Sequence, residues 1–203
     1  DGLVHVRGAV PADTAAALRA AVDVELASRR ADNDERWFGN VYGFQEKGQR
    51  WDLKLALGQE VVAALGGLLG HLQGVLEAEQ PSWTLAELAA MCTRPGDPGQ
   101  PVHADTSQAY DHRIVTAFVA LHDIQECRGP TRMYPRTHTD NLLHLGLKTL
   151  DERCGVLCAM TCGDCVLMDS RLLHHGTANT SPDSRYLFYT SWAPEGGTFG
   201  GST

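Results

Sequence analysis

The feature that most constrains the fold is a change of pattern near residue 80, where helical periodicity gives way to short strand-like segments. Glycine, proline, aspartate or asparagine separates most of these segments, as is typical of turns between β-strands. The expected strands cover residues 85–93, 101–106, 113–124, 131–134, 155–161, 165–169 and 186–192. Helices followed by many short strands predict an all-β core with flanking helices, an α+β arrangement of the antiparallel sandwich or jelly-roll type.

The chain before residue 80 predicts mainly helices. Residues 3–10 alternate like a strand, and residues 14–30 then predict an alanine-rich helix with apolar side chains at helical spacing. Asp13 is placed to cap this helix. A second helical region is expected over residues 53–77, where four glycines weaken the prediction of one continuous helix.

Residues 31–50 are polar, aromatic and punctuated by glycine, so they predict a long loop or short hairpin outside the core. Their aromatic side chains form either a lid over the barrel mouth or a small satellite core under the loop. As a lid, this part of the chain would bring Trp37, Arg50 and Asp52 to a substrate.

Length and composition limit the classes of function. We expect one domain of 203 residues, with a helical buttress and lid region over 1–80, a jelly-roll core over 81–195 and a frayed tail after it. An apolar content of 43% excludes global disorder, and no apolar run reaches the eighteen residues of a membrane span. The net charge of −8 comes without a basic face, which argues against a nucleic-acid partner. The charge does not name a substrate. No membrane partner is expected, and a monomer is favoured over an oligomer.

Six cysteines are present, and four of them lie between residues 154 and 165. A chain of this length does not need a disulfide framework, so we expect reduced thiols in a soluble, intracellular (cytoplasmic) protein without a leader segment. Only Cys162 and Cys165 have CxxC spacing, and without a second such pair a structural zinc site is disfavoured.

His103-Ala104-Asp105 is the strongest chemical signal, because alternate residues of a strand face the same side. One more histidine from a distant part of the chain would complete a face of two imidazoles and one carboxylate. That set suits Fe(II) and leaves open coordination positions. Most His-X-Asp tripeptides have no such role, so the surrounding sequence decides.

That surrounding sequence resembles the phytanoyl-CoA dioxygenase-like family of Fe(II)/2-oxoglutarate-dependent oxygenases. The family shows a His-X-Asp strand, a Gly…Pro…His turn, a Gly-Asp turn before a strand, and a second histidine followed by Asn at +5 and Arg at +11. The matching residues here are His103 and Asp105, Gly129 to His138, Gly163-Asp164, His174, Asn179 and Arg185. Arg136-Thr137 stand where the family more often has Gly-Ser, so that loop is expected to differ. The resemblance is strong over residues 103–192 and weak over 31–80.

Two adjacent histidines compete for the second ligand position. Counted from His174, Asn179 and Arg185 lie at the family offsets of +5 and +11, whereas counted from His175 they lie at +4 and +10. His174 is therefore the expected ligand, and His175 is expected to face outward or to lie behind the metal site. If both bound a metal, a zinc hydrolase-like site would be the alternative.

The resemblance implies a double-stranded β-helix, a cupin-like jelly roll, with N-terminal helices packed on one sheet. It implies Fe(II) held by His103, Asp105 and His174, with 2-oxoglutarate and dioxygen in the remaining positions. Arg185 would hold the distal carboxylate of 2-oxoglutarate, since a guanidinium forks onto a carboxylate. The candidate neighbours of the cosubstrate are Phe118, for which a plain core role is equally open, and Thr116.

The expected activity is hydroxylation of an unactivated C–H bond of a small organic molecule, coupled to decarboxylation of 2-oxoglutarate to succinate and CO2. The carboxylate of Asp105 disfavours halogenation, and no catalytic group beyond the metal ligands is expected. A peptide or protein side-chain oxygenase and a non-catalytic metal-binding jelly-roll module remain open. His112, His122 and His138 are expected to be satisfied or exposed, without a ligand role.

Overall fold

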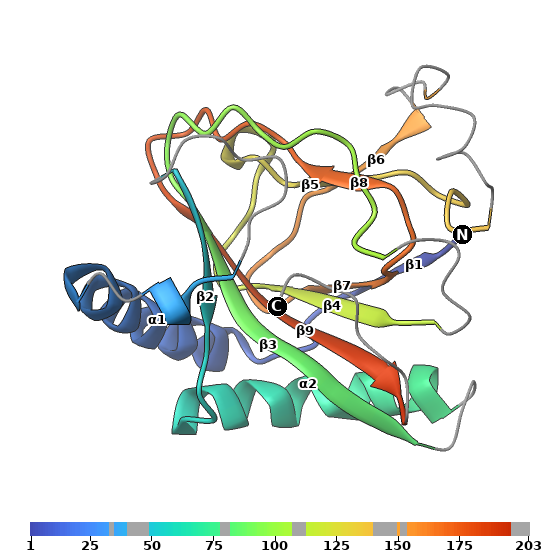
Figure 1. Cartoon of the computed structure of the whole chain (residues 1–203), viewed down its shortest axis with the longest axis horizontal. Helices are drawn as coiled ribbons and strands as arrows, with labels where there is room; N and C mark the ends of the chain where they lie inside the picture. The colour runs from blue at the N-terminus through green and yellow to red at the C-terminus, as the bar shows by residue number, and fades with distance from the viewer. Residues whose placement is uncertain are drawn as a thin grey trace.

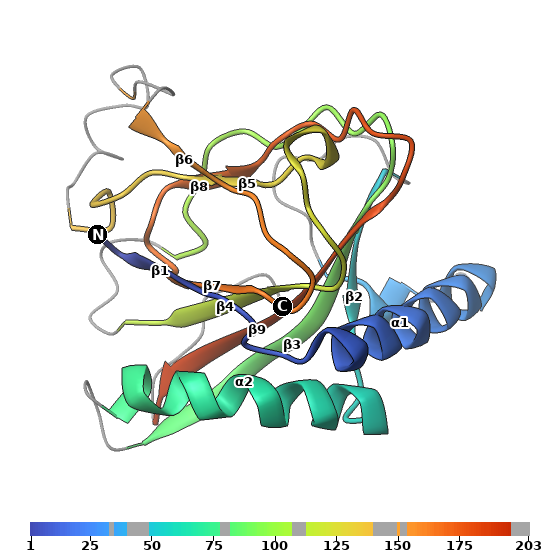
Figure 2. The same ribbon diagram turned by 180° about the vertical axis from the view of Figure 1, so that it is seen from behind.

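The structure is a computed structural model that describes residues 1–32, 35–39, 49–77, 82–106, 113–139, 150 and 154–195. It has three layers, which Figures 1 and 2 show from opposite sides: a small sheet, a large sheet and, on the far side of the large sheet, two helices. The predicted α+β fold with a jelly-roll core is confirmed.

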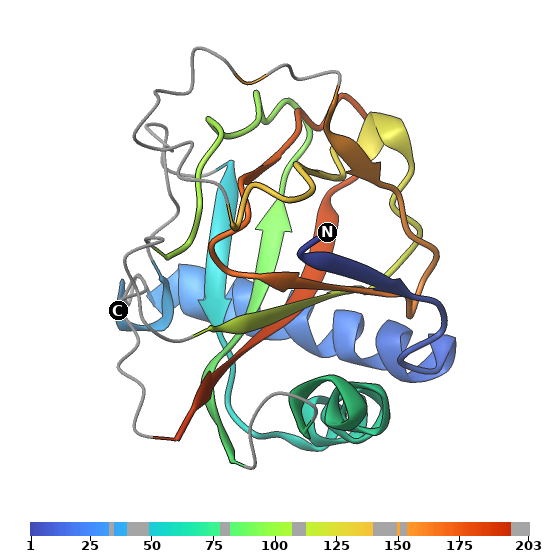
Figure 3. The same ribbon diagram turned by 90° about the vertical axis from the view of Figure 1, so that its right-hand side faces the viewer.

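The large sheet has six strands in the order β1-β7-β4-β9-β3-β2, and every neighbouring pair is antiparallel. Its strands are β1 (Leu3–Val6), β2 (Arg50–Lys54), β3 (Trp83–Thr93), β4 (Val115–Ala120), β7 (Cys165–Asp169) and β9 (Arg185–Pro194). Figure 3 shows β9, β3 and β2 side by side, so the start of β9 lies next to the end of β3 and the start of β2.

The small sheet consists of β6 (Val156–Cys158), β5 (Thr131–Met133) and β8 (His174–Gly176), in that order and also antiparallel. A single bridge between His103 and His174 attaches the segment after β3 to the outer side of β8. Two short 3-10 helices complete the described elements: η1 (Glu35–Trp37) and η2 (Glu126–Arg128).

The two helices cover the outer face of the large sheet. Helix α1 (Ala12–Asp32) buries Leu18, Val22 and Leu26, which recur every four residues and therefore form one apolar stripe. Helix α2 (Gln59–Glu77) buries Val61, Leu65, Leu68, Leu72 and Leu76 in the same way. The glycines of α2 do not interrupt it, because this stripe packs against the sheet and tertiary contacts override local propensity.

Apolar side chains form two cores, one on each face of the large sheet. The outer core lies under the helices and includes Tyr186 and Phe188 of β9. The inner core lies between the sheets and includes Leu187 of β9, together with Met168 and Met133. Since alternate residues of β9 face opposite sides, Arg185 and Tyr189 face the inner space with Leu187.

The N-terminal part departs from the predicted elements. The helix expected over 53–77 begins only at Gln59, and Leu53 and Lys54 instead end β2 at the edge of the large sheet. Residues 31–50 were expected outside the core, yet Trp37 and Phe38 pack against the outer core, and Phe38 forms a bridge with Leu53. Residues 40–48 lie outside the described residues, as do His112 and residues 196–203.

The strand expected over 101–106 is reduced to the single bridge at His103, and the one expected over 113–124 is shortened to β4. All six cysteines are free thiols, and three of them, Cys92, Cys158 and Cys165, are buried. Among the described residues, no helix is both long and apolar enough to cross a membrane.

Candidate metal centre

Three side chains that the sequence predicts as metal ligands converge at the edge of the small sheet. Nε2 of His103 lies 3.7 Å from Oδ1 of Asp105, and Nε2 of His174 lies 3.6 Å from the same oxygen. One ligand atom from each residue lies within 4.8 Å of the other two. The three atoms are therefore close enough to share one ion.

Backbone hydrogen bonds hold the ligand segment in place. The amide of His103 donates to the carbonyl of His174 at 3.0 Å, and the amide of His174 donates back at 2.8 Å. The amides of Asp105 and Thr106 both donate to the carbonyl of Ser170, which fixes the turn that carries the carboxylate. The distant histidine is thus positioned by the same bridge that positions the first.

Each histidine uses its other ring nitrogen to fix its orientation. Nδ1 of His103 lies 2.9 Å from the carbonyl of Pro101, and Nδ1 of His174 lies 2.9 Å from that of Leu172. A ring that donates from Nδ1 has a lone pair on Nε2, the form in which imidazole binds metals. Burial lowers the pKa of both histidines to about 4, so both are neutral at pH 7.

Asp105 forms the open side of the cluster, since 35% of its side chain is exposed whereas both imidazoles are buried. Desolvation by the surrounding protein raises the pKa of Asp105, although the remaining contact with water limits this effect. The positive charge that His103 carries when it is protonated opposes the shift. A bound cation would reverse the shift by favouring the carboxylate. The donor set of two neutral imidazoles and one carboxylate fits Fe(II).

His175 does not join the cluster. It follows His174 in β8, so its side chain lies on the other face, where its ring stacks on Tyr134 at 5.9 Å between centroids. His122 is buried and accepts a hydrogen bond from the amide of Tyr186 at 2.9 Å, and its other hydrogen-bond partner is Arg128 rather than a ligand residue. Of the neighbouring histidines, the structure therefore brings only His174 to His103 and Asp105 within the described residues.

Arg185 lies at the start of β9 with 2% of its surface exposed. Its guanidinium donates to the carbonyl of Gly129 and, at 3.0 Å, to Oγ1 of Thr93. Nε of Arg185 has no hydrogen-bond partner among the described residues. Burial, together with the nearby charge of Arg50, lowers the pKa of Arg185 to about 9. A buried cation with an unused donor and no carboxylate hydrogen-bonded to it fits the distal end of 2-oxoglutarate.

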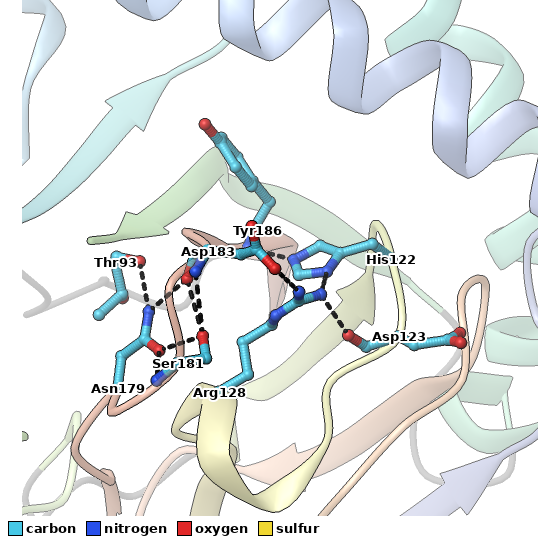
Figure 4. Close-up of polar contacts among 8 residues, drawn as sticks. All are labelled: Thr93, His122, Asp123, Arg128, Asn179, Ser181, Asp183 and Tyr186. Carbon is cyan, nitrogen blue, oxygen red and sulfur yellow. Dashed lines mark hydrogen bonds and ion pairs between the residues drawn. The ribbon is translucent and has the colours of Figure 1, made fainter. Parts of the chain in front are cut away.

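The chain between His174 and Arg185 is fixed by a polar network, shown in Figure 4. The side-chain amide of Asn179, which is fully buried, donates to the carbonyl of Thr93 at 3.2 Å and to that of Asp183 at 2.9 Å. Oγ of Ser181 donates to Oδ1 of Asn179 at 2.7 Å. The Asn found at +5 in the sequence thus maintains the spacing between the second histidine and the arginine.

Phe118 and Thr116 differ in their surroundings, although both face inward from β4. The ring of Phe118 lies 6.4 Å from that of His174, beside the ligand cluster. Thr116 is paired with Ser191 and shares a 3.1 Å hydrogen bond with its hydroxyl. Ser191 is six residues beyond Arg185, or about 20 Å along the strand. The structure therefore does not bring Thr116 to Arg185.

The three residues expected at the substrate separate in the structure. Asp52 faces inward and accepts a 2.8 Å hydrogen bond from the hydroxyl of Tyr189. Arg50 is also buried and lies two residues before Asp52, as the first residue of β2, but it pairs with Asp97. Trp37 packs with the outer core under the guanidinium of Arg29, 3.8 Å from the ring centroid, so it does not line the space between the sheets.

Sequence reasoning missed Glu87, Tyr189 and Ser191, which lie on the same inner face. Oγ of Ser191 donates to Glu87 at 3.0 Å. Burial raises the pKa of Asp52 to about 6 and that of Glu87 to about 7, because water no longer stabilises either charge fully. The available signal was the alternation of β9, which places Tyr189 and Ser191 on the face of Arg185.

Comparison with solved structures finds proteins of the same fold. SnoN, a non-heme alpha ketoglutarate dependent epimerase from nogalamycin biosynthesis, matches with a TM-score of 0.71 and 21% identity, over 96% of this chain and 77% of its own. AviO1 from Streptomyces viridochromogenes Tue57 matches with a TM-score of 0.74 and 18% identity, over 98% and 92%. SnoK, a non-heme alpha ketoglutarate dependent carbocyclase from nogalamycin biosynthesis, matches with a TM-score of 0.69 and 20% identity, over 95% of this chain and 79% of its own. These likenesses show the fold.

No curated protein matches the chain. The family model for phytanoyl-CoA dioxygenase (PhyH) matches residues 1–187 of this chain. The match covers most of the chain and includes the first residues of β9. The predicted resemblance is therefore confirmed, and the chain belongs to the phytanoyl-CoA dioxygenase family of iron- and 2-oxoglutarate-dependent enzymes.

Proposed function

We propose that the protein holds Fe(II) through His103, Asp105 and His174 and uses it, with 2-oxoglutarate and dioxygen, to hydroxylate a small organic molecule at an unactivated C–H bond. 2-Oxoglutarate is decarboxylated to succinate and CO2 in the same cycle. The observation that carries the proposal is the convergence of two neutral imidazoles and one carboxylate within 4.8 Å. The iron and its cosubstrate supply the oxidising chemistry, and the protein supplies position and shielding.

The ligand residues set which side of the metal reacts. His103 and His174 are buried and Asp105 is partly exposed, so these three residues would hold the ion from one side, and cosubstrate and dioxygen would bind on the side that they leave open. The hydrogen bonds of both Nδ1 atoms keep the imidazoles oriented without rearrangement when the metal binds. The ring of Phe118 covers His174 from the inner core and excludes water there.

Arg185 supports the orientation of 2-oxoglutarate. Its keto acid end would bind at the metal while its distal carboxylate receives the fork of the guanidinium. Because Arg185 is buried and already held by Gly129 and Thr93, its position is set before the cosubstrate arrives. Such preorganisation reduces the entropy lost on binding.

The inner face beyond the metal is polar and supports a substrate with hydrogen-bonding groups. Asp52 with Tyr189 and Glu87 with Ser191 form two hydrogen-bonded pairs there, and Tyr189 and Ser191 lie four and six residues beyond Arg185 along β9. Their carboxylates and hydroxyls would orient a substrate by accepting and donating hydrogen bonds. We assign these four residues to the substrate side of the site.

The test is turnover of 2-oxoglutarate by the purified protein. We expect succinate formation that needs both Fe(II) and 2-oxoglutarate and that is absent in His174→Ala. Once a substrate is found, the product mass identifies the reaction: hydroxylation adds one oxygen, whereas the epimerisation named for SnoN leaves the mass unchanged. Succinate formation that persists in His174→Ala would contradict the assignment of this metal site.

A further inference from the structure

A second buried arginine lies close to Arg185. Arg50 of β2 is paired with Thr93 of β3, and Thr93 is paired with Arg185 of β9, so the three residues form a row across adjacent strands. Residues directly opposite one another in a sheet face the same side. Both arginines therefore face the space between the sheets, with Thr93 between them, at the strand ends that Figure 3 shows side by side.

The guanidinium of Arg50 reaches the strand that carries His174. A Cβ atom added to Gly176 would lie 2.7 Å from Nη1 and 3.0 Å from Nη2 of Arg50, so the group packs directly on the backbone of β8. Gly176 is two residues beyond His174, or about 7 Å along the strand. Arg50 thus lies at about the distance from the metal cluster that a five-carbon diacid would span.

Arg50 keeps donors that the protein does not use. Its side chain is completely buried, and Nη2 donates to Oδ1 of Asp97 at 2.8 Å. Nε and Nη1 of Arg50, Oδ2 of Asp97 and Nε of Arg185 have no hydrogen-bond partner within the part of the chain that the structure describes. Buried donors are normally satisfied, so unused donors on two neighbouring arginines indicate a missing acceptor.

The charges also leave room for one anion. The charged side chains of Arg50 and Arg185 carry two positive charges, and Asp97 carries one negative charge. The ion pair uses one cation and leaves the other without a counter-charge. A buried charge without a partner is strongly unfavourable, and one incoming carboxylate would balance it.

We propose that Arg50 and Arg185 together hold the distal carboxylate of 2-oxoglutarate, with Asp97 keeping Arg50 in place. This inference rests on the proposed function, because it concerns the cosubstrate of the same site. It moves Arg50 from the substrate, where the sequence placed it, to the cosubstrate. It also gives β2, an edge strand from the N-terminal part, a direct role in cosubstrate binding.

The test compares two ligands that differ only at the distal end. 2-Oxoglutarate and 2-oxobutyrate share the keto acid group, but 2-oxobutyrate has no second carboxylate. Their dissociation constants are measured by calorimetry with the Fe(II)-loaded protein without oxygen, and the readout is the ratio of the two constants. The main variant is the double substitution Arg50→Gln and Asp97→Asn, which removes the ion pair while leaving the summed charge of Arg50, Asp97 and Arg185 unchanged.

In the double variant we expect the preference for 2-oxoglutarate to fall about ten- to a hundredfold, the loss that follows removal of hydrogen bonds to a charged group. The affinity for 2-oxobutyrate stays near the wild-type value, which shows that the fold and the metal end are intact. Arg185→Gln is the positive control and loses preference as well. If the double variant does not fold, Arg50→Lys retains the charge beside Asp97 but not the fork, and the preference falls severalfold.

Two negative results have different meanings. If the wild-type protein binds Fe(II) and prefers 2-oxoglutarate, but the folded Arg50 variants retain that preference within about twofold, Arg50 only partners Asp97 and the inference is wrong. If the wild-type protein binds no 2-oxoglutarate in the presence of Fe(II), the proposed function itself fails and the inference fails with it.

Discussion

Glu87 gives a quantitative test of how the inner face is arranged. Burial raises its pKa from 4.5 to about 7, against the opposing hydrogen bond from Ser191. An acid whose pKa is higher in the folded state stabilises that state below the unfolded pKa, and the contribution is lost as the pH rises through the folded pKa. The difference between the two pKa values of Glu87 corresponds to a contribution of at most about 3 kcal/mol to the free energy of unfolding. Glu87→Gln removes the titration but keeps an acceptor for Ser191.

The assay is urea unfolding of the metal-free protein from below pH 4.5 to above pH 7. We expect the free energy of unfolding of Glu87→Gln, relative to wild type, to rise by about 2 to 3 kcal/mol across this window. Titration of His103 and His174, whose pKa values are lowered from 6.5 to about 4, makes the free energy of unfolding rise with pH over the acidic part of this range. This effect is present in both proteins, so it cancels when the variant is compared with wild type. A constant difference between wild type and variant would show that Glu87 is not desolvated.

Three further predictions concern stability. Leu53→Ala removes a fully buried side chain from the outer core and should lower the free energy of unfolding by about 2–5 kcal/mol, whereas Leu57→Ala, at an exposed position, changes it little in the same urea titration. Asn179→Ala removes the amide that donates to the carbonyls of Thr93 and Asp183, and it removes the acceptor of the Ser181 hydroxyl, so thermal unfolding should show a loss of about 1–3 kcal/mol; an unchanged melting temperature would contradict this role. Gly163→Ala places a Cβ against the carbonyl of Val10 at a φ of +87°, so we expect poor recovery of folded protein. A thermal unfolding curve by circular dichroism that matches wild type would contradict this prediction.

The sequence predicted elements that are bounded by local signals. β7 was expected over 165–169 and forms there, because the Gly163-Asp164 turn precedes it and its first four residues are apolar. β2 was missed because its alternation is short and its partner β3 lies more than thirty residues away along the chain. Its pairing is a tertiary contact, and no local pattern encodes it.

The candidate site divides in the same way. His103, Asp105 and His174 were found because their spacing from one another and from Arg185 is readable along the chain. Glu87 and Tyr189 were missed, since their place on the inner face depends on strand register and on a bulge in β3 near Leu85. Arg50 was found as a polar candidate for the substrate, and the different role that we propose for it depends on the register of β2 against β3, which places it in line with Arg185.

The most direct test of the central claim is the stoichiometry of Fe(II) binding to the purified protein without oxygen. The histidine pair in β8 supplies a matched control, since His174 faces Asp105 and His175 stacks on Tyr134. We predict one Fe(II) per chain for wild type and for His175→Ala, and none for His174→Ala. Iron retained by His174→Ala and lost by His175→Ala would contradict the account.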